Sequence, residues 1–247
     1  MAVIIKKKSP LRSTYRRLNW AAALSCGVGI LSLMVFFAAF LGLRQLSWLD
    51  MVLLLIFGLG LVAGAVFSGK RQVLRAGLQG EEAAAELVSH LPESYRCYQN
   101  LTVSHRGKAS EMDLVITGPT GVFIVEVKHQ NGTVFGRYGD SHWVQEKVGR
   151  KGGNYKKQFY SPVKQVGTHT YRLANWLRSR GLNPHISSMV YFSNPDTALH
   201  LKGDPQEIFV FAAGCDGGRA LCQAIRKNSD RVSAKLLKEI NRQLDRL

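Results

Sequence analysis

Two long apolar runs, separated by a short polar turn, stand near the start of the chain. Residues 20–43 carry no formal charge, and a helix of that length would be about 36 Å long, enough to cross a hydrocarbon core of about 30 Å. A second apolar run covers residues 46–67. Only Arg44 and Gln45 stand between the runs as strongly polar residues. The pattern therefore predicts a transmembrane helical hairpin over residues 20–67.

Other interpretations of these runs fit less well. A cleaved signal peptide would have a shorter apolar region, a small-residue cleavage site and no second span behind it. Asp50 is either a functional intramembrane carboxylate or, as its position beside the turn favours, a group that reaches the head-group region. Gly58, Gly60 and Gly64 would allow close packing between the helices.

Basic residues flank the hairpin on both outer sides. Residues 1–19 are rich in Lys and Arg, and Lys70, Arg71 and Arg75 follow the second run, whereas the turn carries only one Arg. Because basic flanks stay on the cytoplasmic side, we expect a multi-pass protein, in a bacterial inner membrane, with both termini cytoplasmic. The domains expected are a basic segment at 1–19, the hairpin at 20–67, a linker at 68–79 and a soluble domain at 80–247.

The soluble domain alternates between helical and strand-like patterns. Helices are expected at 80–91, 162–180, 216–227 and 230–247, and strands at 96–103, 113–117, 122–127, 186–193 and 207–211. The turn Gly118–Gly121 would join two of these strands as a hairpin, and the apolar strand that follows it belongs in the middle of a sheet. The glycine-rich and basic stretch 132–157 is expected to be a long loop with a short strand near 142–145. The fold class predicted is α/β with a central mixed sheet.

Composition narrows the function without naming it. The four cysteines, Cys26, Cys97, Cys215 and Cys222, form no CxxC pair, so neither a disulfide framework nor a zinc site is favoured, and free thiols fit a reducing compartment. The formal net charge is +16. A basic soluble domain fits either a surface close to an anionic membrane or a polyanionic partner, nucleic acid first.

Three charged residues stand at the ends of two neighbouring predicted strands. Glu126 and Lys128 share one face of their strand because side chains alternate, and the hairpin brings Asp113 alongside them. Two carboxylates and an ammonium suit phosphodiester hydrolysis: the carboxylates hold Mg²⁺, and the lysine orients or deprotonates the attacking water. The alternative is a solvated ion pair at a strand end, and spacing alone does not exclude it.

Several short stretches occur in an order that is typical of a known family. They are Gly77-Leu78-Gln79-Gly80-Glu81, Met112-Asp113-Leu114-Val115-Ile116, Gly121-Val122-Phe123-Ile124-Val125-Glu126-Val127-Lys128, then Gly132, Trp143 and Ser161-Pro162-Val163-Lys164-Gln165. On these residues the chain resembles the nuclease-related domain (NERD) family, a branch of the PD-(D/E)xK restriction-endonuclease-like superfamily.

The resemblance implies a fold and a set of roles. The fold would be a restriction-endonuclease-like sandwich, and the activity a divalent-metal-dependent hydrolysis of DNA or RNA. The implied roles are metal ligands for Asp113 and Glu126, with Mg²⁺ or Mn²⁺ as the ion, catalytic lysine for Lys128, auxiliary carboxylate for Glu81, and a helix residue facing the site for Gln165. The residues alone leave open whether Glu81 or Glu82 turns inward.

Nucleic-acid contacts are expected in the basic stretch. Arg150, Lys151, Lys156 and Lys157 would meet phosphates, while nearby aromatic residues, Trp143 among them, could stack on unpaired bases. A solvated flexible loop is the equally weighted alternative. The function expected is thus a membrane-anchored nuclease acting on DNA first. The alternatives are a catalytically weak or inactive nucleic-acid- or protein-binding module on the membrane, and a structural membrane protein.

Overall fold

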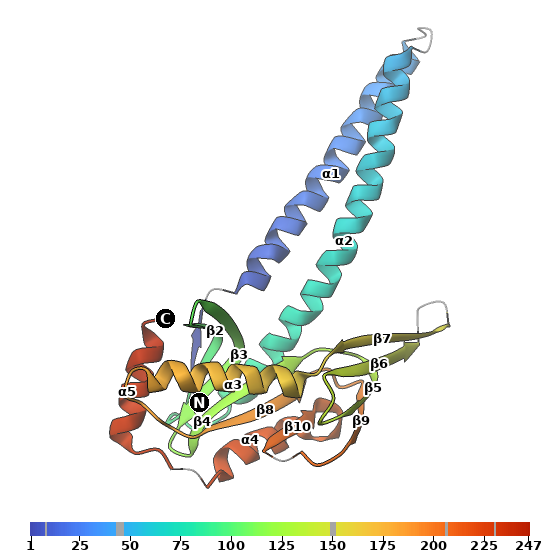
Figure 1. The fold of residues 1–247 in the computed structure, drawn as a ribbon. Coiled ribbons are helices and arrows are strands. Elements are labelled where there is room, and N and C mark those ends of the chain that lie inside the picture. The colour runs from blue at the N-terminus through green and yellow to red at the C-terminus, as the bar shows by residue number, and fades with distance from the viewer. Residues whose placement is uncertain (8, 43–46, 149–151, 206, 230) are drawn as a thin grey trace. The chain divides into compact units, whose positions relative to one another are not determined.

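The structure is a computed structural model that describes residues 1–7, 9–42, 47–148, 152–205, 207–229 and 231–247 (Figure 1). The chain divides into two compact units. Ser9–Leu78 form a helical hairpin, while Met1–Lys8 and Gln79–Leu247 form an α/β domain. Each unit is described by itself below.

The hairpin consists of two long helices. α1 spans Pro10–Leu41, and α2 begins at Trp48 and continues to Ser89. Both are long and apolar enough to cross a membrane by length and composition, and 11% and 6% of their most apolar windows are buried. Most of their apolar side chains are therefore exposed in the protein alone, which is consistent with a membrane anchor.

Small residues bring the two helices close together. A Cβ atom added at Gly60 would lie 2.8 Å from the backbone oxygen of Ser25 and 3.0 Å from Cα of Gly29. At Gly64 it would lie 2.6 Å from Sγ of Cys26. The prediction of close packing is thus confirmed at Gly60 and Gly64, whereas a Cβ added at Gly58 would meet nothing within 4 Å.

Asp50 caps the start of α2. Its Oδ2 accepts hydrogen bonds from the backbone N (2.7 Å) and the Oγ (2.8 Å) of Ser47, and its side chain is buried. Acidic groups in the first turn of a helix are stabilised by the free N–H groups there. This local role accounts for a carboxylate at the edge of an apolar run.

Two segments assigned from the sequence to the tail and the linker are ordered elements. Residues 68–78 are helical within α2, which runs without a break from the hairpin to Ser89. Val3–Lys6 form strand β1, which pairs in parallel with β2 (Arg96–His105). The residues before the hairpin therefore contribute to the sheet of the domain that follows it.

The α/β domain is built on a six-stranded mixed sheet in the order β1-β2-β3-β4-β8-β10. The strands not yet bounded are β3 (Lys108–Gly118), β4 (Gly121–Lys128), β8 (Ile186–Phe192) and β10 (Ile208–Ala212). β3 and β4 form the antiparallel hairpin predicted from the sequence. β4 pairs in parallel with β8 on its other side, so it is central, as its apolar pattern predicts.

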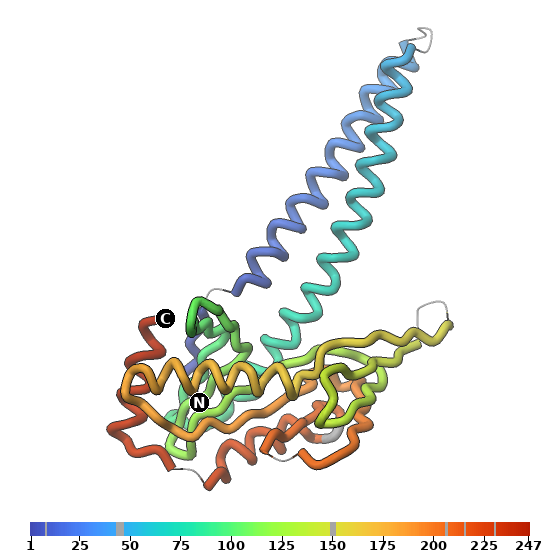
Figure 2. The backbone as a smooth tube through the Cα atoms, in the orientation of Figure 1, coloured from blue at the N-terminus to red at the C-terminus, as the bar shows by residue number. Residues whose placement is uncertain are grey.

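Helices cover both faces of this sheet (Figure 2). α3 (Pro162–Arg178) and α5 (Ala234–Asp245) pack on one face around Leu173, Trp176 and Ile240. The end of α2 and α4 (Gly217–Lys227), which follows a short 3₁₀ turn at Ala213–Cys215, pack on the other. The arrangement confirms the predicted α/β sandwich preceded by a helical hairpin.

A second sheet occupies the stretch expected to be a loop. It has the order β7-β6-β5-β9, with β5 at Gly132–Arg137, β6 at His142–Val148, β7 at Asn154–Tyr160 and β9 at Thr197–Lys202. The expectation of one short strand in a loop is corrected: long-range parallel pairing of β5 with β9 closes a small sheet.

Candidate active site

The candidate site forms where β3 and β4 separate. Their pairing runs from Gly118 and Gly121 to Leu114 and Val125 and ends there. Beyond that point, Oδ2 of Asp113 accepts a hydrogen bond of 2.7 Å from the backbone N of Val127. The carboxylate thereby replaces the missing strand partner of a buried N–H, and this fixes the Asp113 side chain against the end of β4.

Glu126 and Lys128 lie on the same side of β4, as their alternation predicts. Nζ of Lys128 is 2.6 Å from Oε1 of Glu126 and donates a second hydrogen bond, of 3.0 Å, to Oε1 of Gln165. The Glu126 side chain is 1% exposed and the Lys128 side chain 21%. The structure therefore brings Asp113, Glu126, Lys128 and Gln165 together at one end of the central strand.

His169 is a site residue that the sequence reasoning missed. Its Nε2 lies 3.3 Å from Oε2 of Glu126, and its Nδ1 lies 2.6 Å from Oγ of Ser110. Nε2 of His169 and Oε2 of Glu126 are both buried, and neither makes a hydrogen bond among the described residues. His169 stands four residues after Gln165, so the two side chains share one face of a helix. This spacing is the signal in the sequence that could have identified His169 as a site residue.

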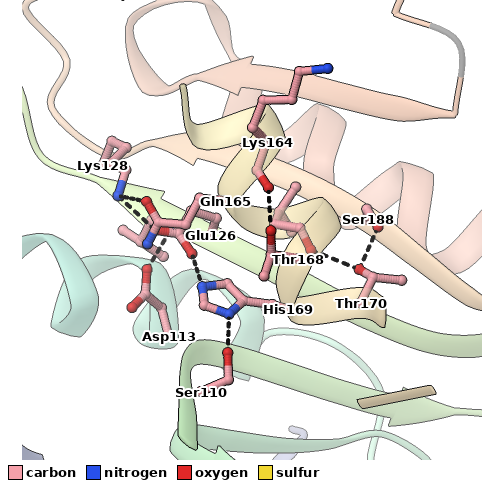
Figure 3. A network of polar contacts seen from close by, with 12 residues as sticks. Ser110, Asp113, Glu126, Lys128, Lys164, Gln165, Thr168, His169, Thr170 and Ser188 are labelled. Carbon is pink, nitrogen blue, oxygen red and sulfur yellow. Dashed lines mark hydrogen bonds and ion pairs between the residues drawn. The ribbon is translucent and has the colours of Figure 1, made fainter. Parts of the chain in front are cut away.

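Helix α3 presents both side chains to the site (Figure 3). Its N-cap is Ser161, whose Oγ accepts from the backbone N of Lys164 at 3.5 Å, and Pro162 occupies the first turn. Both choices favour helix initiation. Gln165 and His169 point from the next turns toward Lys128 and Glu126.

The two central carboxylates have opposite pKa shifts. Burial and the negative charge of Glu126 raise the pKa of Asp113 well above its usual value. Burial alone would also raise the pKa of Glu126, but His169 and the positive charge of Lys128 outweigh it and lower that pKa. Glu126 is therefore the more stable anion of the pair, whereas for Asp113 the positive charge of Lys128 and the hydrogen bond from Val127 do not outweigh burial and the charge of Glu126.

Glu81 is the carboxylate of α2 that turns toward this region. Its Oε2 accepts a 2.9 Å hydrogen bond from Nδ2 of Asn100, and its charge, together with burial, raises the pKa of Glu111. Glu82 is exposed. The helix comes this close because Gly80 has no side chain: a Cβ there would lie 2.5 Å from Cβ of His129.

The donor set fits a hydrated divalent cation. Among the described residues no cluster of three or more His, Cys, Asp or Glu side chains is arranged to hold a metal. Mg²⁺, however, keeps several of its waters and is commonly held by one or two carboxylates. Asp113 and Glu126 supply two. Oε2 of Glu126 makes no hydrogen bond among the described residues, and burial and the charge of Glu126 raise the pKa of Asp113 despite the nearby Lys128.

The predicted nucleic-acid contacts lie in the small sheet. Lys156 and Lys157 are neighbours on β7 and both are exposed, whereas Arg150 and Lys151 lie outside the described residues. Trp143 is fully buried and is not available for stacking on bases. The described part of the basic stretch is thus mostly strand, with Lys156 and Lys157 accessible and Trp143 in the core.

Comparison with known proteins supports a nuclease-related fold for this part of the chain. The family model of the nuclease-related domain (NERD) matches residues 76–193, which confirms the resemblance seen in the sequence. An uncharacterized protein of Bacillus anthracis is 30% identical over 117 residues, which are 47% of this chain and 52% of that protein. The chain therefore spans about half the length of this curated relative. No solved structure matches.

Proposed function

We propose that this protein is a membrane-anchored, divalent-metal-dependent nuclease that hydrolyses phosphodiester bonds, with DNA as the first expected substrate and RNA as the second. The observation that carries the proposal is the meeting of Asp113, Glu126 and Lys128 at the buried end of β4, within residues that match a nuclease-related domain. Burying such charges is costly unless they have partners or a task.

Each side chain has a role in this proposal. Asp113 and Glu126 would hold Mg²⁺ or Mn²⁺, which when bound neutralises charge on the phosphate and the leaving oxygen. Lys128 orients the attacking water and stabilises negative charge that develops during the reaction. Gln165 holds the ammonium of Lys128 by its 3.0 Å hydrogen bond.

His169 and Ser110 hold the carboxylate of Glu126 in position. His169 lies between Oε2 of Glu126 and the hydroxyl of Ser110, so it limits the rotation of the Glu126 carboxylate. Glu81 adds negative charge near Asp113, in keeping with an auxiliary carboxylate.

Membrane attachment by the hairpin completes the proposal. The exposed apolar side chains of α1 and α2 have their simplest environment in lipid. β1 precedes the hairpin and the rest of its sheet follows it, which supports a topology with both ends of the hairpin on one side of the membrane. The basic flanks favour the cytoplasmic side. Reporter fusions at Met1 and Leu247 should then both report the cytoplasm, and a C-terminal fusion active only outside would refute this topology.

Cleavage by the full-length protein in detergent tests the activity. Plasmid, single-stranded DNA and RNA are each incubated with and without Mg²⁺ or Mn²⁺. The parent should cleave only with the ion, and Asp113→Ala should not cleave. Asp196→Ala, which removes an exposed carboxylate outside the site, serves as the matched control and should cleave like the parent.

The same assay separates the nuclease from its alternative. If Asp113→Ala and Glu126→Ala bind Mn²⁺ and cleave as the parent does, these residues are not the metal site and the proposed mechanism is wrong. If the parent binds nucleic acid but cleaves none of the substrates with either ion, the nuclease proposal is refuted and the alternative, a membrane-tethered binding module, is supported.

A further inference from the structure

We infer that the solvent-facing side of the small sheet, here called the outer face, binds single-stranded nucleic acid by stacking bases on its aromatic side chains. The inference rests on the proposed nuclease function and gives it a substrate class. It also differs from the expectation drawn from the sequence, because the aromatic residues concerned are not those that the basic stretch alone suggested.

Alternation along the strands separates the two faces of this sheet. The inner residues pack into the domain core; they are Val134, Trp143, Phe159, Leu199 and Leu201. The strand register places the intervening residues together on the opposite side. The outer face is defined by Phe135, Arg137, His142, Glu146, Lys156, Tyr160, His200 and Lys202.

Four aromatic rings lie on the outer face in two pairs. The rings of Phe135 and His200 are stacked, with centroids 5.1 Å apart and planes at 16°. His142 and Tyr160 meet edge to face, with centroids 5.9 Å apart. Phe135 is 40% exposed and Tyr160 49%. Exposed aromatic groups arranged along a sheet are the platforms on which unpaired bases stack.

Positive charge surrounds these rings. Arg137 and Lys202 are register partners of β5 and β9, and Lys156 lies on β7. Glu146 is the one carboxylate of the outer face among its described strand residues, and it is 2.5 Å from Nζ of Lys156. The face therefore has an excess of cations beside aromatic groups, which complements a phosphate backbone that carries bases.

Residues 132–160 form three of the four strands of the small sheet, and both ends of this segment adjoin the candidate site. β5 starts four residues after Lys128. At the other end, Tyr160 is followed directly by Ser161, the N-cap of the helix that carries Gln165, and the backbone N of Ser161 donates to the oxygen of Ser141 beside His142. A strand held by Tyr160 and His142 is thus held next to the start of α3.

Stacking favours single strands over duplexes. In a duplex the bases are already stacked on each other, so their faces are not available to a protein, and binding relies on the backbone charges. A single strand can place its bases on the rings and its phosphates on Arg137 and Lys202. The proposal therefore predicts that loss of a ring affects single strands much more than duplexes.

The test measures binding to full-length protein in detergent, with EDTA to prevent cleavage. The probes are a fluorescent thymidine oligonucleotide of about 20 nucleotides and a duplex of the same length, followed by anisotropy. Phe135→Ala and Tyr160→Ala should each weaken single-strand binding by about 5- to 100-fold and leave duplex binding nearly unchanged. Tyr160→Phe, which keeps the ring, should bind like the parent.

Tyr155 provides the matched control. It lies on the same strand as Tyr160 and is similarly exposed, at 50%, but its side chain lies on the opposite side, where Nζ of Lys147 is 5.6 Å from the ring. Tyr155→Ala should bind the single strand like the parent. Equal losses for Tyr155→Ala and Tyr160→Ala, or equal losses for single strand and duplex, would overturn the proposal.

The result can be separated from the fate of the nuclease proposal. If single-strand binding depends on Tyr160 but the protein cleaves no nucleic acid, the binding role of the outer face is supported and the nuclease proposal is refuted. The opposite result is also possible to recognise. If Phe135→Ala and Tyr160→Ala do not change the cleavage of single-stranded oligonucleotides at substrate concentrations below KM, the nuclease proposal stands and the binding role of the outer face is refuted.

Discussion

The two sheets of the α/β domain each hold a Glu–Lys pair at almost the same distance. Nζ of Lys128 is 2.6 Å from Glu126 in the large sheet, and Nζ of Lys156 is 2.5 Å from Glu146 in the small one. The surroundings differ. The large sheet is covered on both faces and the Glu126 side chain is 1% exposed, whereas the Glu146 side chain is 36% exposed and that of Lys156 is 69% exposed.

The two pairs show that the distance between nitrogen and oxygen does not by itself determine how much an ion pair contributes to stability. Exposed pairs contribute about 0–1 kcal/mol because water and salt screen them. A buried carboxylate has lost its hydration and depends on its partners, so loss of one side is expensive. The large sheet therefore holds charges in a fixed arrangement suited to chemistry, and the small sheet holds paired but exposed charges that a ligand can reach.

The largest expected difference is in catalysis by the two lysines. Lys128→Gln should lower kcat by at least about 10²- to 10³-fold, because in the proposed mechanism it removes a positive group that acts on the reacting phosphate. Lys156→Gln should raise KM and leave kcat unchanged, since in the proposal its charge acts in substrate binding. Steady-state cleavage with Mg²⁺ measures both.

Metal affinity gives the control for this prediction. Lys128→Gln should bind Mn²⁺ at least as well as the parent, because a positive charge next to the carboxylates is gone. Equal kcat values for Lys128→Gln and the parent would show that Lys128 has no role in catalysis.

The next largest difference is in stability after removal of each carboxylate charge. Glu126→Gln should lower the free energy of unfolding by about 3 kcal/mol, because Lys128 and His169 lose a buried partner. Glu146→Gln should change it by less than about 1 kcal/mol. Unfolding of the full-length protein in detergent and EDTA, followed by tryptophan fluorescence, measures both. Similar effects of the two changes would contradict the distinction between the sheets.

Local sequence patterns were sufficient for the core of the large sheet. The turn at Gly118–Gly121 and the apolar strand after it predicted the β3–β4 hairpin, and alternation placed Glu126 beside Lys128. These features depend on contacts between residues close in sequence. His169 and Ser110 were missed because their contacts depend on how α3 crosses the sheet, although the spacing from Gln165 to His169 was a usable signal.

The small sheet could not be predicted because its decisive contacts are distant. Residues 132–157 combine glycine with many charges, which weakens the strand pattern. β9, at Thr197–Lys202, pairs in parallel with β5 and had no strand assigned to it. Likewise β1 is a short edge strand in a segment that reads as a basic tail, and it forms only because β2 offers an edge.

The last prediction compares two aspartates and has the smallest expected effect. Burial and Glu126 raise the pKa of Asp113 in the folded protein, while Asp140 is exposed in the turn between β5 and β6. A raised pKa means that the folded state binds the proton more tightly than the unfolded state does. The stability that Asp113 contributes is then complete below its unfolded pKa, about 3.9, and is lost as pH rises through its folded pKa.

Asp113→Asn removes this loss, so in EDTA its melting temperature should exceed that of the parent by a margin that grows as the pH is raised from about 4 and becomes constant above the folded pKa. Asp140→Asn should show no such trend. Adding Mg²⁺ should stabilise the parent and Asp140→Asn but not Asp113→Asn, because only the first two keep both carboxylates. If Asp113→Asn melts below the parent at pH 8, the Asp113 carboxylate is stabilised by its surroundings instead of being repelled by Glu126, and a cation would not be needed to relieve it.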